Sequence, residues 1–381
     1  MCRPLKKSGR KNRKDINVAL KIVRVDADTH HEHGREHRIH QHLQDSPVAR
    51  ANITHPGRRK IVQLLDDFAL GTSHQCLVLE VMGRDVQARA DDHTGGRLPG
   101  KTGRDLTRQI ALGLDYLWKC GVAHGDLHAG NVLFTAPTIT ALPEEQIKRC
   151  LGEPATGAVR RRDGGPLGPS MPRYLVRPAT FRGSDTEAKI VDLGRAFFHN
   201  NDPPERLQTP CHMLAPEALF GQPLGPGVDM WSMGCLLFEI MTGRSFVDTI
   251  LADNVSTITG IESHIGAAPA KWKAALDEKT RERIRQYRVK PMDLERYLRL
   301  AYDQDDAQLL DIAEEDDDDG EDEIPIEDYE KAKRELSDEE LGVLGDTLRR
   351  LLTYLPASRG SPETLLRSPW IQGRQADEAE L

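Results

Sequence analysis

Five short strings occur in order along the chain, and together they restrict its fold more than any other feature. They are VALK at 18–21, HGDLHAGN at 124–131, DLG at 192–194, APE at 215–217 and DMWSMGC at 229–235. The second string carries an Asp and an Asn five residues apart, and the third carries another Asp after a β-branched run. Oxygen ligands of this kind suit Mg²⁺. Because five such strings do not assemble by chance, we expect one fold with one site that binds charged groups.

In order and context the five strings resemble the landmarks of the eukaryotic-type protein kinases. The resemblance covers residues 17–372. The Leu in DLG, the long insert before it and an acidic insert late in the chain are similar to the SR-protein kinases, especially their fungal members. The resemblance implies an α+β, bilobal protein-kinase fold with a reduced, strand-rich N-lobe and a mainly helical C-lobe. It also implies a serine/threonine kinase that transfers the γ-phosphate of ATP, with Mg²⁺, to protein hydroxyls.

The predicted domain boundaries follow these strings and the changes in composition between them. We predict a basic N-terminal stump at 1–16, a truncated N-lobe at 17–82, a C-lobe at 83–372 with inserts near 135–187 and 303–335, and a C-terminal tail at 373–381. A polar, Gly-rich connection is predicted at 91–103. Apolar periodicity predicts strands at 17–25, 60–68, 75–81 and 189–194, and helices at 28–44, from 105, and at 143–151, 227–243 and 338–356.

The resemblance assigns catalytic roles to residues of these strings. Asp126 would accept the proton of the substrate hydroxyl, and Asn131 and Asp192 would hold Mg²⁺. Lys21 would hold the α and β phosphates of ATP. A carboxylate of the following helix would orient that lysine, and we choose Glu36, with Glu32 as the fallback.

Further roles concern adenine binding and architecture. Backbone groups of Glu80 and Met82 in CLVLEVMG would bond the adenine edge, and Leu133 and Ala19 would enclose the ring from the two sides. Glu217 and Arg359 resemble a buried structural ion pair of the second lobe. Asp229 resembles the residue that braces the catalytic loop.

Four departures from the family pattern leave alternatives open. Gly125 stands where the family has Arg, His128 where it has Lys, and Leu214 where related kinases place Arg. No Gly-rich loop precedes VALK in this sequence, so we expect weak MgATP binding and an N-lobe sheet with exposed apolar side chains. One alternative is therefore a catalytically weak pseudokinase that acts as a binding module. Another is a small-molecule phosphotransferase of the aminoglycoside or choline kinase type, because HGDLHAGN also resembles the catalytic loop of those enzymes.

Charge and composition limit the classes of partner that the chain can have. Lys and Arg number 52 against 60 Asp and Glu, a net charge of −8, which argues against direct nucleic-acid binding through overall charge. The resemblance implies protein substrates, Arg/Ser-rich splicing-type proteins among them. No apolar run is long enough to span a membrane. We expect a monomer in the cytoplasm, the nucleus or both.

The helix predicted at 28–44 contains three regularly spaced histidines. His33, His37 and His40 fall on one helical face, which is metal-ligand spacing. No cysteine partner and no HExxH string accompanies them. We therefore interpret them as an exposed polar face.

Overall fold

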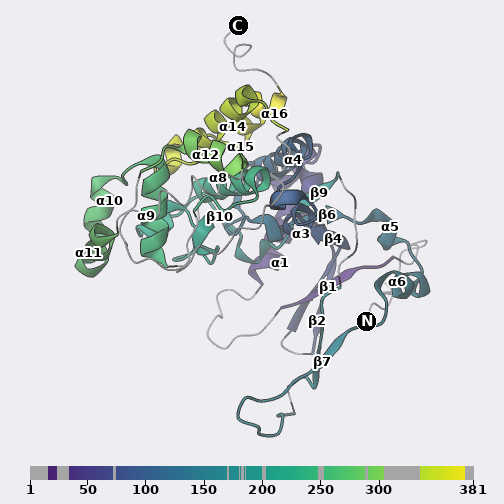
Figure 1. The fold of residues 1–381 in the computed structure, drawn as a ribbon. Helices are drawn as coiled ribbons and strands as arrows, with labels where there is room; N and C mark the ends of the chain where they lie inside the picture. Colours follow the sequence, from purple (N-terminus) through teal and green to yellow (C-terminus); the bar gives the residue numbers. More distant parts are fainter. Residues whose placement is uncertain are drawn as a thin grey trace. The chain divides into compact units, whose positions relative to one another are not determined.

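The structure is a computed structural model in which the chain forms two compact units (Figure 1). It describes residues 16–23, 34–71, 74–169, 171–179, 181, 184, 186–199, 203–247, 253–287, 291–303 and 335–373. The first unit contains Met1–Arg24, Gln63–Arg84 and Phe134–Asp185, and the second contains Val25–Val62, Asp85–Leu133 and Thr186–Leu381. Glu32, His33, most of the N-terminal stump and most of the acidic run at 303–323 lie outside the described residues. The lobe boundaries at 17–82 and 83–372 stay a prediction.

The first unit is built on a three-stranded antiparallel sheet. Its strand order is β1 (Ala19–Ile22), β3 (His74–Leu79) and β2 (Leu64–Leu70). The middle of the central strand β3, Cys76–Val78, is buried, whereas Leu20 and Ile22 on the outer strand β1 are 47% and 53% exposed. That exposure agrees with the expected uncovered sheet.

The remainder of the first unit comes from the insert. It contains α5 (Pro137–Thr140), α6 (Glu144–Leu151) and a hairpin of β7 (Thr156–Ala158) and β8 (Tyr174–Val176). Helix α6 confirms the helix predicted at 143–151. The side-chain amide of Asn17 donates to the carbonyls of Ile139 and Leu142, both at 2.8 Å, and so ties the start of β1 to the insert. Strand β4 (Met82–Asp85) neighbours β6 (Val132–Thr135) in a separate small sheet.

The second unit is mainly helical, and its long helices are α4 (Gly100–Lys119) and α8 (Gly227–Thr242). The structure corrects the connection predicted at 91–103, because α4 begins at Gly100. A Cβ added at Gly103 would lie 2.4 Å from the sulfur of Met241. The glycine is therefore a close-packing position between two helices and not a loop residue.

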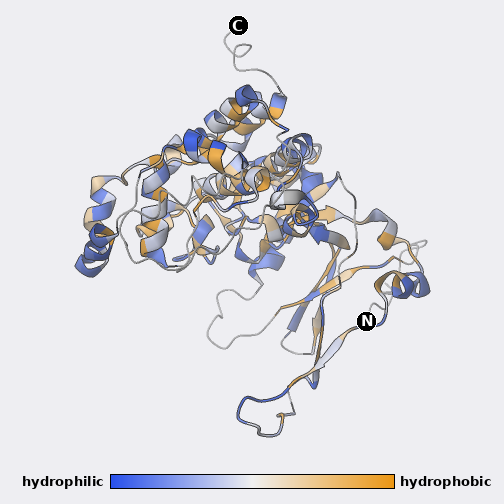
Figure 2. Ribbon diagram, in the orientation of Figure 1, coloured by the Kyte–Doolittle hydropathy of each residue, from blue (hydrophilic) through white to orange (hydrophobic). Residues whose placement is uncertain are grey.

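Helix α8 confirms the prediction of an interior helix. Every residue of it except Glu239 is buried, and Figure 2 shows apolar residues around much of its surface. A helix that is apolar on all sides has no solvent face and must be enclosed. Asp229 in its first turn is therefore held in a rigid, buried frame.

Helix α1 (Arg35–Asp45) overlaps the helix predicted at 28–44, and it corrects the expectation for the histidine face. His40 is only 2% exposed, on the same side as Glu36, Ile39 and Leu43. Two apolar residues are too few to show the buried side in a sequence so rich in histidine. The expectation of an exposed face is wrong for His40, and His37 is half-buried.

Three further predictions are corrected at their ends. The strand predicted at 60–68 begins at Leu64, because Pro56–Lys60 form a 3₁₀ helix, η1, whose first turn is capped by the His55 ring. The strand predicted at 189–194 is β9 (Ala188–Ile190), followed by the 3₁₀ turn η4 (Leu193–Arg195). The helix predicted at 338–356 is shorter, as α14 (Asp338–Leu351).

The other helices of the second unit complete it. They are α2 (Pro47–Ala51), α3 (Val86–Ala90), α7 (Pro216–Leu219), α9 (Asn254–Ile265), α10 (Ala270–Ala275), α11 (Glu278–Gln286), α12 (Leu294–Asp303), α15 (Pro362–Leu366) and α16 (Pro369–Gln372). Among all the helices of the described residues, none is long and apolar enough to cross a membrane.

Candidate active site

A short strand presents the loop at 124–131. Strand β5 (Val122–Ala123) follows α4 and pairs antiparallel with β10 (Phe197–Phe198), which follows η4. Both strands are anchored by buried residues, among them Ala123 and Phe197. The two polar strings HGDLHAGN and DLG are thus brought to the same end of a small two-stranded sheet.

Asp229 holds the backbone of the loop at 124–131, in the bracing role that the resemblance predicted. Its Oδ2 accepts the N–H of His124 at 2.7 Å and its Oδ1 accepts the N–H of Gly125 at 2.9 Å. The carboxylate is 5% exposed, and this burial raises the pKa of Asp229. Two backbone donors fixed by one carboxylate hold the turn before Asp126 in a single conformation.

The loop is also bound to the DLG segment. The Nε2 atom of His124 lies 2.9 Å from the carbonyl of Val191, and the N–H of Val191 donates to the carbonyl of Asn131 at 2.9 Å. The next residue, Asp192, has a φ of 58° and is the one non-glycine residue of the described chain with positive φ. Such a backbone is held only where its surroundings enforce it.

Asp126 and Asn131 are brought into direct contact. The side-chain nitrogen of Asn131 donates to the backbone carbonyl of Asp126 at 2.9 Å and to its Oδ2 at 3.4 Å. The other carboxylate oxygen, Oδ1, is buried and has no hydrogen-bond partner among the described residues. Burial raises the pKa of Asp126, with nearby Asp192 adding to the effect and His128 opposing it. This oxygen is therefore an acceptor in need of a donor.

His128 occupies the position where the family has Lys. Its Nδ1 accepts the N–H of Gly130 at 3.1 Å, so the ring proton of the neutral form is on Nε2, which lies 4.0 Å from Oδ2 of Asp126. Burial lowers the pKa of His128. The side chain thus offers an N–H donor near Asp126 in place of a fixed positive charge.

The donor set fits Mg²⁺. Because the Asn131 nitrogen donates to Asp126, its amide oxygen is the atom left to act as a ligand. Asp192 would supply a second oxygen ligand, and its Oδ1 accepts the N–H of Gly194 at 3.1 Å. Hard oxygen donors are what Mg²⁺ prefers. When bound, the ion would neutralise phosphate charge.

The other predicted residues are distributed over both units. Lys21 pairs opposite Leu77 in the sheet of the first unit, with Ala19 on the same strand. Met82 begins β4, also in the first unit. There the carboxylate of Glu80 accepts the N–H of Gln63 at 2.8 Å. Their roles toward ATP stay predictions.

Glu36 and Leu133 belong to the second unit. Glu36 is 7% exposed on α1, and α1 packs against η4, the turn that contains the DLG glycine. Leu133 is half-buried on β6, two residues after Asn131. A role for Glu36 toward Lys21, like a role for Leu133 toward adenine, stays a prediction.

Two residues of the site were missed from the sequence. The ring of His124 joins the two strings, and the Thr209 hydroxyl, 7% exposed, donates to the carbonyl of Gly125 at 3.0 Å. His124 stands inside a recognised string and could have been assigned. Nothing in the sequence around Thr209 marks it, because its partner is 84 residues away.

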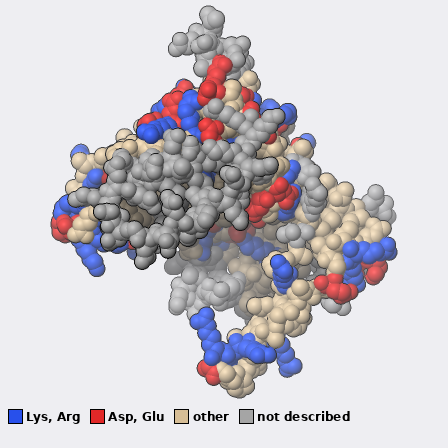
Figure 3. All heavy atoms as spheres, in the orientation of Figure 1, with Lys and Arg blue, Asp and Glu red and all other residues tan. Residues whose placement is uncertain are grey.

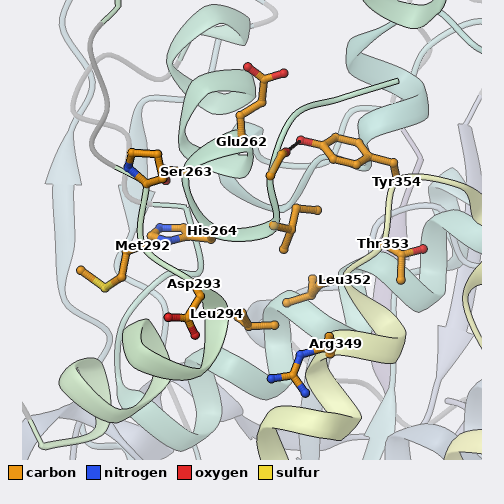
Figure 4. Close-up of a pocket in the computed structure, with 13 residues that line it drawn as sticks. Glu262, Ser263, His264, Met292, Asp293, Leu294, Arg349, Leu352, Thr353 and Tyr354 are labelled. Carbon is orange, nitrogen blue, oxygen red and sulfur yellow. Dashed lines mark hydrogen bonds between the residues drawn. The ribbon is translucent and has the colours of Figure 1, made fainter. Parts of the chain in front are cut away.

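A separate cavity of 560 Å³ lies between the end of α9, the start of α12 and the end of α14 (Figure 4). The ring of His264 stacks on Tyr297 at 3.8 Å beside it, and burial lowers the pKa of His264 to about 4. Charged residues of the lining are already paired: Glu262 contacts Lys273 at 2.8 Å. None of the predicted site residues lines this cavity, so it is not part of the candidate active site.

Comparison with known proteins decides the family. The sequence pattern of the protein kinase domain matches residues 7–150 and 179–371. The chain belongs to the protein kinase family. A solved kinase domain gives a TM-score of 0.58 at 18% identity, covering 97% of this chain and 94% of that chain, which supports the same fold for this kinase.

Curated relatives of this kinase confirm the resemblance to the SR-protein kinase group. Serine/threonine-protein kinase SRPK of Physarum polycephalum is 28% identical over 248 residues, which cover 59% of this chain and 54% of that protein. Protein kinase dsk1 of Schizosaccharomyces pombe is 24% identical over 317 residues, which cover 61% and 57%. Dual specificity protein kinase CLK1 of Homo sapiens is 26% identical over 271 residues, which cover 70% and 46%. The matches thus span about half the length of these relatives.

Gly125 gives a first prediction for this kinase. Its φ is 73°, and an added Cβ would lie 2.7 Å from the carbonyl oxygen of Arg195. Gly125→Ala is expected to lower the free energy of unfolding by about 1–3 kcal/mol and to reduce peptide phosphorylation, because the turn before Asp126 must move. Thermal melting and a kinase assay check this.

The matched control is Gly121→Ala. Gly121 has the same φ of 73°, but no atom lies within 4 Å of an added Cβ. This variant carries only the cost of the left-handed backbone, about 1–2 kcal/mol, and should keep its activity. Equal effects of the two substitutions would show that contact with Arg195 is not what requires Gly125.

Proposed function

We propose that the chain is a serine/threonine protein kinase that transfers the γ-phosphate of ATP, with Mg²⁺, to Ser or Thr hydroxyls of proteins. The observation that carries the proposal is the carboxylate of Asp126. Its Oδ1 is buried without a partner among the described residues, and its Oδ2 is held by Asn131. A substrate hydroxyl is the donor that this oxygen lacks.

In this mechanism Asp126 receives a proton at Oδ1. The hydroxyl oxygen forms its bond to the γ-phosphorus while the bond to the β-phosphate oxygen breaks and ADP leaves. Positioned general bases of this kind contribute about 10²–10⁴-fold to a rate. Asp229 and His124 act through the backbone, because they fix the loop that carries Asp126. Asn131 and Asp192 would hold Mg²⁺, and Lys21 would hold the α and β phosphates.

Particular residues argue against the two alternatives, a binding module and a small-molecule phosphotransferase. A pure binding module has no physical need for Lys21, Asp126, Asn131 and Asp192 together, and it has no need for a strained backbone at Asp192. A small-molecule phosphotransferase would not need the APE glutamate that Arg359 holds in the second unit. Both observations support the protein kinase proposal.

We infer that the substrates are Arg/Ser-rich proteins, as the resemblance to SR-protein kinases implies. The net charge of −8 favours basic substrates. Action in the cytoplasm, the nucleus or both, as a monomer, fits such substrates. The direct test is phosphate transfer by the purified full chain to an Arg-Ser peptide, with choline and an aminoglycoside as competing acceptors. Phosphate on choline or the aminoglycoside, and none on the peptide, would support the small-molecule class instead.

A second prediction concerns charge preference. An Arg-Ser peptide should be phosphorylated with a higher kcat/KM than a neutral or acidic Ser peptide, and the difference should shrink with added salt. The reason is that exposed charges are screened beyond a Debye length of about 10 Å at 0.1 M salt.

Deleting residues 311–323 tests whether the acidic run docks the substrate or is only a solvated loop. A raised KM at low salt supports docking, and an unchanged KM excludes it.

A further inference from the structure

The β7–β8 hairpin of the insert exposes apolar side chains that its own fold leaves uncovered. Tyr174, Leu175 and Val176 are consecutive and are 60%, 64% and 52% exposed, and every residue of β7 is exposed as well. Tyr174 and Val176 lie side by side on one face of the strand, and whereas single apolar residues on a surface are ordinary, contiguous ones mark interaction sites. A lone two-stranded hairpin is also marginally stable in water. A partner that covered these side chains would therefore stabilise the hairpin.

The register of the hairpin leaves the outer edge of β8 open. Backbone bonds join Val159 to Arg173 at 3.0 Å and Arg177 to Ala155 at 2.8 Å. Bonded and non-bonded pairs alternate in an antiparallel ladder, so Tyr174 and Val176 are non-bonded positions. Their N–H and C=O groups point away from β7. No described residue bonds to that outer edge of β8.

The same edge is strongly basic. Arg173 and Arg177 flank β8, and Arg160 and Arg162 lie at the turn end of β7. All four are exposed, and none is paired with a carboxylate among the described residues. Lys and Arg side chains gather over the hairpin in Figure 3. Arg161 alone is paired, with Asp163.

Strand geometry places the charges in a pattern. Side chains alternate between the two faces of a strand, so Arg173, Leu175 and Arg177 share one face of β8. Tyr174 and Val176 share the other. A strand added along β8 would place every second side chain beside the arginines and the others beside Tyr174 and Val176.

We propose that the open edge of β8 binds an extended, acidic segment of a partner protein by strand addition. The unpaired backbone groups of Tyr174 and Val176 supply ladder bonds, and carboxylates at alternate positions of the segment meet Arg173 and Arg177. A polypeptide is favoured over a nucleic acid or a lipid surface, because the edge presents peptide-matching donors and acceptors between the arginines. The net charge of −8 also opposes polyanions larger than a short segment. This inference does not depend on the proposed kinase activity.

The test measures binding of the full chain to a labelled eight-residue peptide in which Glu alternates with Thr. Fluorescence anisotropy at 50 mM and 200 mM salt should show binding that weakens with salt. Arg173→Glu should weaken binding at least tenfold, whereas Arg149→Glu, an exposed charge reversal on α6 of the same unit, should leave it unchanged. Loss of binding in both variants, or in neither, overturns the proposal.

A second measurement leaves the protein unaltered, in case Arg173→Glu disturbs the hairpin. The same peptide carrying N-methyl groups on alternate amides keeps its charges but cannot form the ladder on one edge. It should bind at least tenfold more weakly than the parent peptide. Equal affinity would show that charge alone is recognised. Tighter binding of a single-stranded oligonucleotide or of phosphatidylserine vesicles than of the peptide, lost with Arg173→Glu, would assign the surface to that class instead.

Discussion

Asp126→Asn is expected to lower kcat for phosphoryl transfer by about 10²–10⁴-fold while the affinity for MgATP stays nearly unchanged. The substitution removes the proton acceptor at Oδ1 but no phosphate contact. The shape of the side chain is kept, so the neighbouring Asn131 can stay in place. Steady-state kinetics on a Ser-containing peptide and calorimetric titration with MgATP measure the two quantities separately.

The control for this prediction is Asp346→Asn, an exposed carboxylate on α14 whose loss should not change the rate. Asp192→Asn is a useful contrast, because it should weaken the metal-dependent part of ATP binding. Full peptide phosphorylation by Asp126→Asn would show that the catalytic assignment is wrong. In that case the partnerless oxygen would be a structural feature of the loop.

The family and the centre of the site could be predicted because they depend on local strings. HGDLHAGN places Asp126 and Asn131 five residues apart, and the tight loop between them brings them into contact. The bracing role of Asp229 came from the resemblance of DMWSMGC to a landmark of the family, although its partners His124 and Gly125 are 105 and 104 residues away. For Asp126 and Asn131 the sequence separation is short, and for Asp229 the motif itself carries the prediction.

Other features could not be predicted because they depend on distant partners. Gly103 lies inside α4 where Met241 packs against it, and His40 is buried on the face of α1 that also carries Ile39 and Leu43. The β7–β8 hairpin lies in a stretch rich in Pro, Gly and Arg, which lacks the apolar alternation of a buried strand. Thr209 meets Gly125 across 84 residues. These contacts are set by tertiary packing, which overrides local pattern.

The buried ion pair of Glu217 and Arg359 carries the largest expected effect on stability. Two parallel bonds of 2.7 Å join the guanidinium to the carboxylate, and both side chains are at most 1% exposed. Arg359 also donates to the carbonyl of Gly227 at 2.8 Å and lies over the ring of Trp231 at 5.2 Å. The pair predicted from APE and SRG is therefore present; it ties α7 to the segment after α14, and the Gly227 bond adds the start of α8.

Glu217→Gln is expected to lower the free energy of unfolding by about 3–5 kcal/mol, because it leaves a buried guanidinium without its counter-charge. Urea denaturation of the full chain measures this. The matched control is Glu363→Gln, which breaks a pair with Arg367 whose side chains are 49% and 76% exposed. Exposed pairs contribute about 0–1 kcal/mol, so this variant should melt like the parent. If both substitutions cost the same, burial would not be what makes the Glu217 pair important. Since α8 carries Asp229 two residues after Gly227, loss of the pair should also loosen the catalytic loop before the chain unfolds. Peptide phosphorylation should then fall at temperatures where the variant is still folded.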